Sequence, residues 1–160
     1  MSVCMFSGHR RLPQDGGALR RALEARVFQL CGQGVDEFLS GGAMGFDLLA
    51  AGAVLQAREA FPQVSLTMVL PCRGQALRYP AGQKALYDEI LRRAQRVDVL
   101  SERYYEGCML ARNRAMAERA DCCLCYLTSS RGGTAHAVGC AGARGLPIIN
   151  LAEDLKQDYV

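Results

Sequence analysis

The chain has 160 residues, a formal net charge of +3, 50% hydrophobic residues and 22% charged residues. This length predicts one domain spanning residues 1–160, and the apolar content excludes general disorder. No apolar run approaches the ~20 residues of a membrane span, and the N-terminus lacks a charged and then apolar signal peptide. We therefore expect a soluble, cytoplasmic protein that does not associate with membranes.

Short apolar runs predict strands, and amphipathic or apolar segments between them predict helices. The predicted strands are Val3–Phe6, Val35–Leu39, Val64–Leu70, Val97–Leu100, Cys122–Leu127 and Leu146–Asn150. The predicted helices are a segment with an apolar stripe from Leu19 to Leu30, then Ala43–Ala60, Ala81–Arg93, Met109–Ala120 and Thr134–Arg144. Strands that are apolar throughout are typical of a parallel sheet covered on both faces. The sequence predicts an α/β, Rossmann-like three-layer domain with a mostly parallel sheet of about six strands, helices on both faces and a peripheral tail after Leu151.

The eight cysteines do not indicate a disulfide scaffold, because such scaffolds are short secreted chains with little core. Cys122 and Cys125 have CxxC spacing, but the chain has no second CxxC or HxxxH pair. The two residues also fall in a predicted strand, where alternate side chains face opposite ways. We therefore expect Cys122, Cys123 and Cys125 to be reduced strand residues that are buried, and we expect no metal site.

Three junctions between a predicted strand and the next helix are rich in glycine or arginine. They are Ser7-Gly8-His9-Arg10, Ser40-Gly41-Gly42-Ala43-Met44-Gly45-Phe46-Asp47 and Arg131-Gly132-Gly133-Thr134. In an open parallel sheet, such loops meet beyond the carboxyl ends of the strands. Glycine lets backbone amides approach an anion, and a helix start supplies unpaired N–H groups and a partial positive charge. The pattern favours a phosphate-binding cleft over simple turns, although its spacing is not the dinucleotide GxGxxG.

Asp47, His9 and Arg112 are the side chains in or near these segments with the clearest chemistry. Asp47 falls in a first helical turn, where it either stabilises the helix dipole or meets ribose hydroxyls or an arginine. His9 has no carboxylate near it in the sequence to orient it, which favours a binding role over general-base catalysis. Arg112 near a helix start opposes the dipole unless an anion compensates, so we expect Arg112→Ala to leave the unliganded protein nearly as stable. We expect Gly42→Val to crowd the path of a phosphate, and also to cost stability if Gly42 has a positive φ.

The three junctions resemble those of the YpsA-like branch of the SLOG superfamily, which is named for the Smf/DprA and LOG proteins. The resemblance extends to Leu70-Pro71, Gln75, Arg112-Asn113 and Met116. The resemblance covers nearly the whole chain in the same order. It implies a Rossmann-like domain that binds or senses a nucleotide or nucleotide-derived ligand such as ADP-ribose or a NAD relative, with no required cofactor. The expected ligand-binding residues are Gly8, His9, Arg10, Ser40, Gly41, Gly42, Gly45, Asp47, Arg112, Asn113, Gly132, Gly133 and Thr134.

Two alternatives remain within the same superfamily. LOG enzymes hydrolyse nucleoside monophosphates and carry PGGxGTxxE, whose Glu is absent after Gly132-Gly133-Thr134. A catalytic residue is therefore unknown, with Asp47 the candidate if the protein is a nucleosidase or phosphoribohydrolase acting on a nucleoside monophosphate or NAD relative. The second alternative is a DNA-binding accessory protein of DprA type, but the chain lacks a concentrated basic and aromatic stripe. We expect a nucleotide-like small molecule as partner rather than nucleic acid, with a homodimer as the assembly considered.

Overall fold

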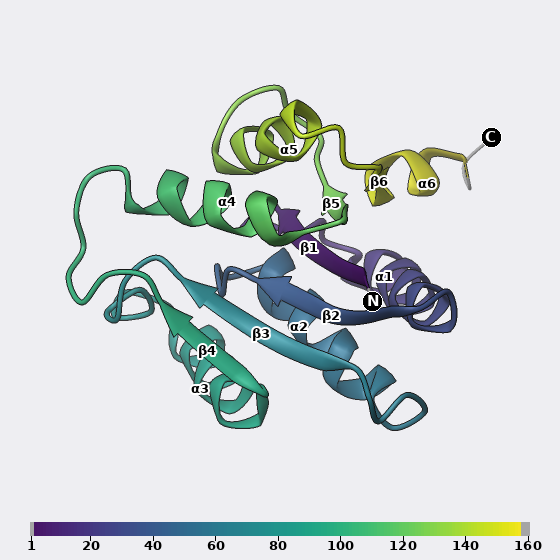
Figure 1. Ribbon diagram of the computed structural model, residues 1–160, viewed down its shortest axis with the longest axis horizontal. Coiled ribbons are helices and arrows are strands. Elements are labelled where there is room, and N and C mark those ends of the chain that lie inside the picture. Colours follow the sequence, from purple (N-terminus) through teal and green to yellow (C-terminus); the bar gives the residue numbers. More distant parts are fainter. Residues whose placement is uncertain (1, 158–160) are drawn as a thin grey trace.

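The computed structural model of the protein describes residues 2–157 and has a six-stranded parallel sheet at its centre. The strands are β1 (Ser2–Gly8), β2 (Val35–Ser40), β3 (Ser65–Leu70), β4 (Arg96–Val99), β5 (Cys122–Tyr126) and β6 (Ile148–Asn150). The helices are α1 (Gly16–Gly32), α2 (Phe46–Ala57), α3 (Ala81–Arg93), α4 (Cys108–Arg119), α5 (Gly133–Ala143) and α6 (Leu151–Gln157). None of these helices is both long and apolar enough to cross a membrane. The predicted α/β, Rossmann-like class is confirmed (Figure 1).

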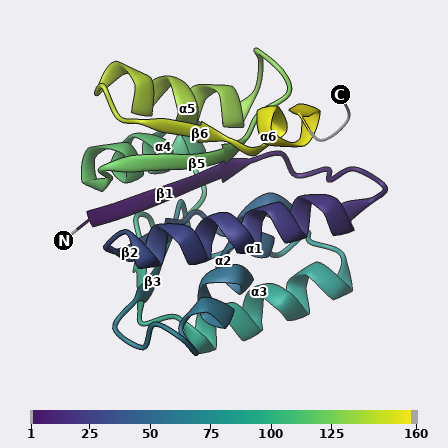
Figure 2. The same ribbon diagram turned by 90° about the vertical axis from the view of Figure 1, so that its right-hand side faces the viewer.

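The order of the strands in the sheet is β4-β3-β2-β1-β5-β6, and all neighbouring pairs are parallel. The chain therefore moves outward from β1 through β2 and β3 to β4, and then returns to place β5 on the other side of β1. This reversal puts the helices that follow β1 and β5 on opposite faces of the sheet (Figure 2). The loops that leave β1 and β5 separate at this point, which opens a crevice at the carboxyl end of the sheet.

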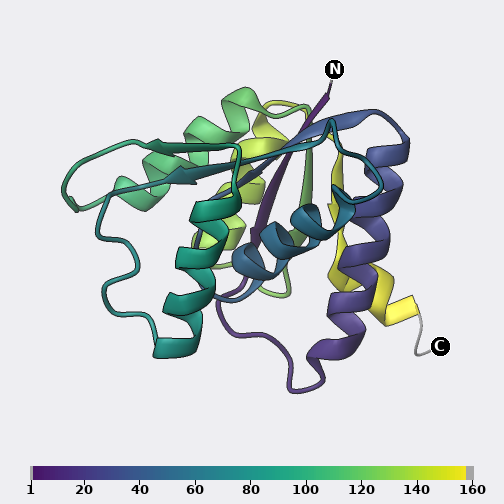
Figure 3. The ribbon, with the colours of Figure 1, turned by 90° about the horizontal axis from the view of Figure 1, so that it is seen from below.

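Two helical layers cover the sheet, as the apolar strands predict. Helices α1, α2 and α3 lie in a row on one face, with α6 beside α1, as Figure 3 shows. Phe6 and Phe38 pack into this layer, whereas Met5 and Leu39 pack against α4 and α5 on the other face. Adjacent strand residues enter opposite layers because side chains alternate along a strand.

The observed helices depart most from the predicted ones at α2 and after β6. α2 ends at Ala57 rather than Ala60, and it begins at Phe46 rather than Ala43, because Gly42 and Gly45 have φ of 73° and 83°, values outside the right-handed helical region. The expectation of a peripheral tail after Leu151 was wrong for residues 152–157, and its residues 158–160 lie outside the described range. Ala152 is buried in α6, and Asp154 of that helix forms an ion pair with Arg26 of α1 at 3.0 Å.

The three cysteines of β5 divide between the two faces of the sheet. Cys122 packs on the side of α1, whereas Cys123 and Cys125 belong to the core under α4 and α5. Cys123 and Cys125 are buried as expected, while Cys122 is half-buried. Because Cys122 and Cys125 lie on opposite faces, the CxxC spacing does not bring their two thiols to one metal ion.

Candidate ligand-binding site

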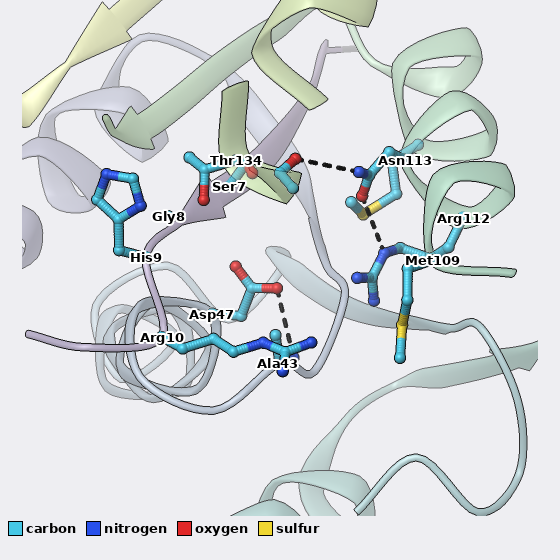
Figure 4. A pocket seen from close by; sticks show the side chains of 12 residues that line it. Ser7, Gly8, His9, Arg10, Ala43, Asp47, Met109, Arg112, Asn113 and Thr134 are labelled. Carbon is cyan, nitrogen blue, oxygen red and sulfur yellow. Dashed lines mark hydrogen bonds between the residues drawn. The ribbon is translucent and has the colours of Figure 1, made fainter. Parts of the chain in front are cut away.

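A pocket of about 240 Å³ lies at the carboxyl end of the sheet, beside the reversal of strand order at β1 and β5. It is lined by Ser7, Gly8, His9, Arg10, Ala43, Asp47, Met109, Arg112, Asn113, Met116, Gly133 and Thr134 (Figure 4). These residues come from the end of β1 and the loop after it, the loop after β2, the first turn of α2, the helix α4 and the start of α5. The reversal of strand order is the place where doubly wound sheets bind their ligands.

Asp47 extends its carboxylate into this pocket from the first turn of α2 (Figure 4). The residue is 5% exposed, and its Oδ2 accepts a hydrogen bond of 3.4 Å from the backbone N–H of Ala43. Its Oδ1 is fully buried and receives no hydrogen bond from any residue in the described range 2–157. A buried carboxylate oxygen without a donor is destabilising, so this atom is suited to a group that a ligand brings.

Burial and the nearby positive charges shift the pKa of Asp47 in opposite directions. Burial raises the pKa of Asp47 to about 6, while the positive charges of Arg112 and Arg10 and the Ala43 N–H act in the other direction. Burial also lowers the pKa of Arg112 from its ordinary value, and the charge of Asp47 opposes that shift. The pocket thus holds a carboxyl group that titrates near neutral pH beside two cations.

Arg112 does not reach toward solvent from the start of α4 but is buried, with an exposed fraction of 6%. Its Nη1 donates to the carbonyl of Gly41, and its Nε donates to Asn113 Oδ1 at 3.1 Å. The premise that Arg112 has no partner without a ligand was therefore wrong, and the stability of Arg112→Ala stays a prediction. The Gly41 carbonyl and the neighbouring Asp47 already supply the negative charge that the argument from the helix dipole assigned to a ligand.

Asn113 joins α4 to the first turn of α5. Its Nδ2 donates to the carbonyl of Gly133 at 3.2 Å and lies 3.2 Å from His136 Nδ1. Gly132 precedes this helix with φ of 98°, and within the described chain no side chain caps the helix start. Gly133 and Thr134 at the start of α5 line the pocket, and the uncapped N–H groups of a helix start carry a partial positive charge that suits an anion.

His9 lines the opposite side of the pocket and connects two loops. Its Nε2 accepts a hydrogen bond of 2.9 Å from the backbone N–H of Thr128, in the loop between β5 and α5. Accepting this bond requires an unprotonated Nε2, so the neutral ring carries its proton on Nδ1. The ring also packs edge-on against Tyr126, with centroids 5.8 Å apart. His9 can therefore donate one hydrogen bond from Nδ1, which agrees with a binding role.

The glycines after β2 support the pocket from behind rather than line it. A Cβ on Gly41 would lie 2.4 Å from the Arg112 guanidinium, and a Cβ on Gly45 would lie 2.3 Å from the carbonyl oxygen of Arg10. Gly42 has φ of 73° and packs beside Leu70, so Gly42→Val would strain the loop directly. The positive φ on which the expected cost in stability depends is confirmed, whereas Gly42 does not line the pocket and its effect on a phosphate path stays a prediction.

Side chains from distant segments hold this glycine loop in place through its backbone. Gln75 Nε2 donates to the Gly41 carbonyl at 3.1 Å, and the Tyr79 hydroxyl donates to the Gly42 carbonyl at 2.9 Å. Gln83 Oε1 accepts from the Gly45 N–H at 3.0 Å. Within the loop, Ser40 Oγ donates to the Asp47 carbonyl at 3.0 Å. These bonds fix the position from which Asp47 enters the pocket.

A family model confirms the resemblance that the motifs indicate. The model YpsA, described as the YspA SLOG family, matches residues 10–139. The chain belongs to the YpsA family of SLOG proteins. It is similar to the UPF0398 protein BH1768 of Halalkalibacterium halodurans, at 27% identity over 72% of this chain and 62% of that protein. It is also similar to the UPF0398 protein YpsA of Bacillus subtilis, at 25% identity over 96% of this chain and 94% of that protein.

Solved structures share the fold of this YpsA-family chain. DNA processing protein A (DprA) of Streptococcus pneumoniae matches with a TM-score of 0.65 and 23% identity, over 92% of this chain and 49% of that protein. DprA of Helicobacter pylori, whose structure concerns single-stranded DNA binding, matches with a TM-score of 0.63 and 21% identity, over 92% of this chain and 63% of that protein. TM1055 matches with a TM-score of 0.62 and 17% identity, over 98% of this chain and 81% of that protein. At these identities the likeness concerns the fold alone.

The pocket of this YpsA-family chain collects some of the expected ligand-binding residues and not others. Those that line it are Gly8, His9, Arg10, Asp47, Arg112, Asn113, Gly133 and Thr134. Those outside the lining are Ser40, Gly41, Gly42, Gly45 and Gly132. The expected ligand-binding residues did not include Ser7, Ala43, Met109 and Met116, although Ser7 and Ala43 belong to the loops predicted to form the cleft. Helical spacing was the available signal for the methionines, because Met109 lies four residues before Asn113 and Met116 four after Arg112.

Proposed function

We propose that this YpsA-family chain binds or senses a nucleotide or nucleotide-derived ligand, such as ADP-ribose or a NAD relative, in the pocket at the end of β1. The observation that carries the proposal is the buried Asp47, which lines a pocket together with the start of α5 and whose Oδ1 has no donor in residues 2–157. One side of the pocket thus suits an anion and another suits a hydrogen-bond donor. A phosphorylated sugar combines these two properties in one small group.

The size of the pocket supports a sugar phosphate as the enclosed part of the ligand. Its volume of about 240 Å³ is below the ~300–1,000 Å³ of pockets that enclose a drug-sized molecule. A whole dinucleotide does not fit inside. The base, or the second half of a longer ligand, would extend past the exposed Arg10 at the pocket edge, where a further phosphate could pair with the guanidinium.

The lining favours binding over hydrolysis of a glycosidic bond. Most glycosidases use two carboxyl groups on either side of the bond that breaks. Asp47 is the one carboxylate among the lining residues of the described chain. No glutamate follows the glycine turn here, where residues 135–138 are Ala, His, Ala and Val. A nucleosidase on this site would have to act with Asp47 and without a second carboxylate.

A ligand panel with thermal unfolding tests the proposal. The protein is titrated with AMP, ADP, ADP-ribose and NAD after denaturation and mass spectrometry have shown that no nucleotide co-purifies. A ligand at one hundred times its dissociation constant should stabilise the folded state by about 2.7 kcal/mol. For a domain of this size, that corresponds to an increase in melting temperature of about 5–10 °C. The absence of a shift with every member of the panel would contradict the proposal.

Two further measurements separate the alternatives. Steady release of adenine from AMP, proportional to protein and abolished by Asp47→Asn, would replace the binding proposal with a nucleosidase. A salt-dependent mobility shift with single-stranded DNA, without any response to mononucleotides, would support a DNA-binding protein instead. We expect neither result.

A further inference from the structure

We infer that Asp47 selects ligands by their sugar hydroxyls, so that the site accepts a ribonucleotide or ribose phosphate and rejects sugars whose ring hydroxyls are absent or esterified. This inference rests on the proposed function and names the substrate class for the same pocket. It assigns Asp47 a role as the residue that determines specificity.

The unpaired acceptor oxygen of Asp47 determines which hydrogen-bonding group the ligand must supply. Oδ2 is already bonded to the Ala43 N–H, and Arg112 donates to Gly41 and Asn113 rather than to Asp47. Oδ1 is therefore the atom that remains, and an ionised carboxylate can only accept hydrogen bonds. A phosphate oxygen at this position would bring two anions together in a buried site, which is strongly unfavourable. The partner of Oδ1 must be an O–H or N–H donor.

The position of the anion-binding start of α5 decides whether the donor to Asp47 Oδ1 is a sugar hydroxyl or a nucleobase amine. Gly133 and Thr134 at the start of α5 line the same small pocket as Asp47. In a nucleotide, the sugar is bonded directly to the phosphate ester and the base lies beyond the sugar. A phosphate at α5 therefore places the sugar, and not the base, within this enclosed volume of about 240 Å³. The ring hydroxyls are the donors that a sugar offers.

The same requirement excludes the interior of a DNA strand. An internal deoxynucleotide has hydrogen at its 2′ carbon, and its 3′ oxygen is esterified to the next phosphate. It has no hydroxyl to donate, so the buried Asp47 Oδ1 would stay without a donor when it is bound. Sites built to bond a hydroxyl discriminate strongly against analogues that lack it, because the buried polar group then loses every partner.

Calorimetric titration with AMP and 2′,3′-dideoxyAMP at pH 7.5 tests this inference. Wild-type protein should bind the dideoxy compound about 10- to 100-fold more weakly, the effect of one lost hydrogen bond to a charged group. In Asp47→Asn the two affinities should agree within about threefold, because the amide attracts a hydroxyl less than a carboxylate does. Asp88→Asn, which removes a carboxylate from α3 that pairs with Lys84 outside the pocket, should keep the wild-type ratio.

The outcomes distinguish this inference from the proposed function. Equal binding of AMP and 2′,3′-dideoxyAMP by the wild-type protein would overturn hydroxyl selection and leave nucleotide binding standing. An Asp47→Asn protein that keeps the full preference would also overturn it. Failure of AMP, ADP, ADP-ribose and NAD to bind at all would overturn both proposals. If Asp47→Asn does not fold, the wild-type ratio by itself still decides.

Discussion

Asp47 and Arg112 show how single residues acquire properties at this site that their positions in the chain do not suggest. Both are charged, both belong to helices, and both are almost fully buried, at 5% and 6% exposure. Arg112 donates to backbone and amide oxygens, while Asp47 keeps one oxygen without a donor in the described range. Buried charges of this kind are destabilising unless paired, so each makes a measurable contribution to stability or binding.

Asp47→Asn should increase stability above pH 6 and leave it nearly unchanged near pH 4. Burial raises the pKa of Asp47 from 3.8 in the unfolded chain to about 6 in the folded protein. The folded state therefore favours the protonated group, and wild-type stability falls as pH rises from about 4 to about 6. Asparagine keeps an oxygen for the Ala43 N–H and has no charge to bury, which should add roughly 1–3 kcal/mol above pH 6. Urea unfolding at several pH values measures this, and a difference that is constant with pH would contradict it.

Arg112→Ala should destabilise the unliganded protein by about 2–4 kcal/mol, contrary to the argument from the helix dipole. The substitution removes a donor from Gly41 and from Asn113 and a cation from beside Asp47. Arg114→Ala is a matched control, because Arg114 lies on the same helix and is exposed. That control should change stability by less than about 0.5 kcal/mol. Chemical denaturation measures the free energy of unfolding of the wild type and of the two variants. Equal stability of Arg112→Ala and Arg114→Ala would contradict the argument from burial.

At the scale of elements, a polar cluster ties the edge strand β4 to α4. Asp98 in β4 accepts from Arg96 Nε at 2.7 Å and from Arg119 Nη1 of α4 at 2.9 Å. Glu37 of β2 lies 3.9 Å from Arg119 and accepts from the Thr67 hydroxyl of β3 at 2.7 Å. Burial alone would raise the pKa of Asp98, but the hydrogen bonds from Arg96 and Arg119 hold it below its ordinary value. The cluster therefore depends on an ionised Asp98.

Asp98→Asn should destabilise the protein at neutral pH by about 0.5–1 kcal/mol, with a pH dependence opposite to that of Asp47. Because the folded pKa of Asp98 lies below its unfolded value, its contribution is present above about pH 4 and is lost as pH falls through the folded pKa. Glu102→Gln, which breaks an exposed pair with Arg73, should have a smaller effect. Denaturant titrations at pH 7 and pH 3 measure the loss of stability caused by Asp98→Asn. A larger loss at pH 3 than at pH 7 would contradict the prediction.

At the scale of the whole molecule, the last helix completes the layer formed by α1, α2 and α3. Leu151 is fully buried in the core under this layer, and Leu155 packs against the same core from the next turn of α6. The ion pair between Arg26 and Asp154 joins α6 to α1, two elements far apart along the chain. The segment Leu151–Gln157 is thus part of the folded unit and not an appendage.

Leu151→Ala should lower the free energy of unfolding by about 2–4 kcal/mol, through lost burial and the cavity left behind. Leu77→Ala makes the same chemical change at a residue that is 82% exposed, and it should have an effect of less than about 0.5 kcal/mol. Thermal and chemical unfolding of the two variants measure the difference. A Leu151→Ala protein as stable as the Leu77→Ala protein would restore the expectation of a peripheral tail.

The sequence by itself determined the features that depend on neighbours along the chain. Apolar runs and helical periodicity predict the alternation of strands and helices, because each element needs apolar residues on the face or faces that it buries. The strands Val35–Ser40 and Cys122–Tyr126 appear within a residue of their predicted ends. The glycine-rich segments were placed correctly at the carboxyl end of the sheet, since every strand of a parallel sheet points the same way.

Only the tertiary structure decided which side chains line the site and which support it. Gly41 and Gly42 receive hydrogen bonds from Gln75 and Tyr79, more than thirty residues away, and these contacts place them behind the pocket. The free oxygen of Asp47 likewise results from Arg112 being directed to the Gly41 carbonyl instead. Local patterns cannot supply this information, because the environment of a buried charge is set by every segment that packs around it.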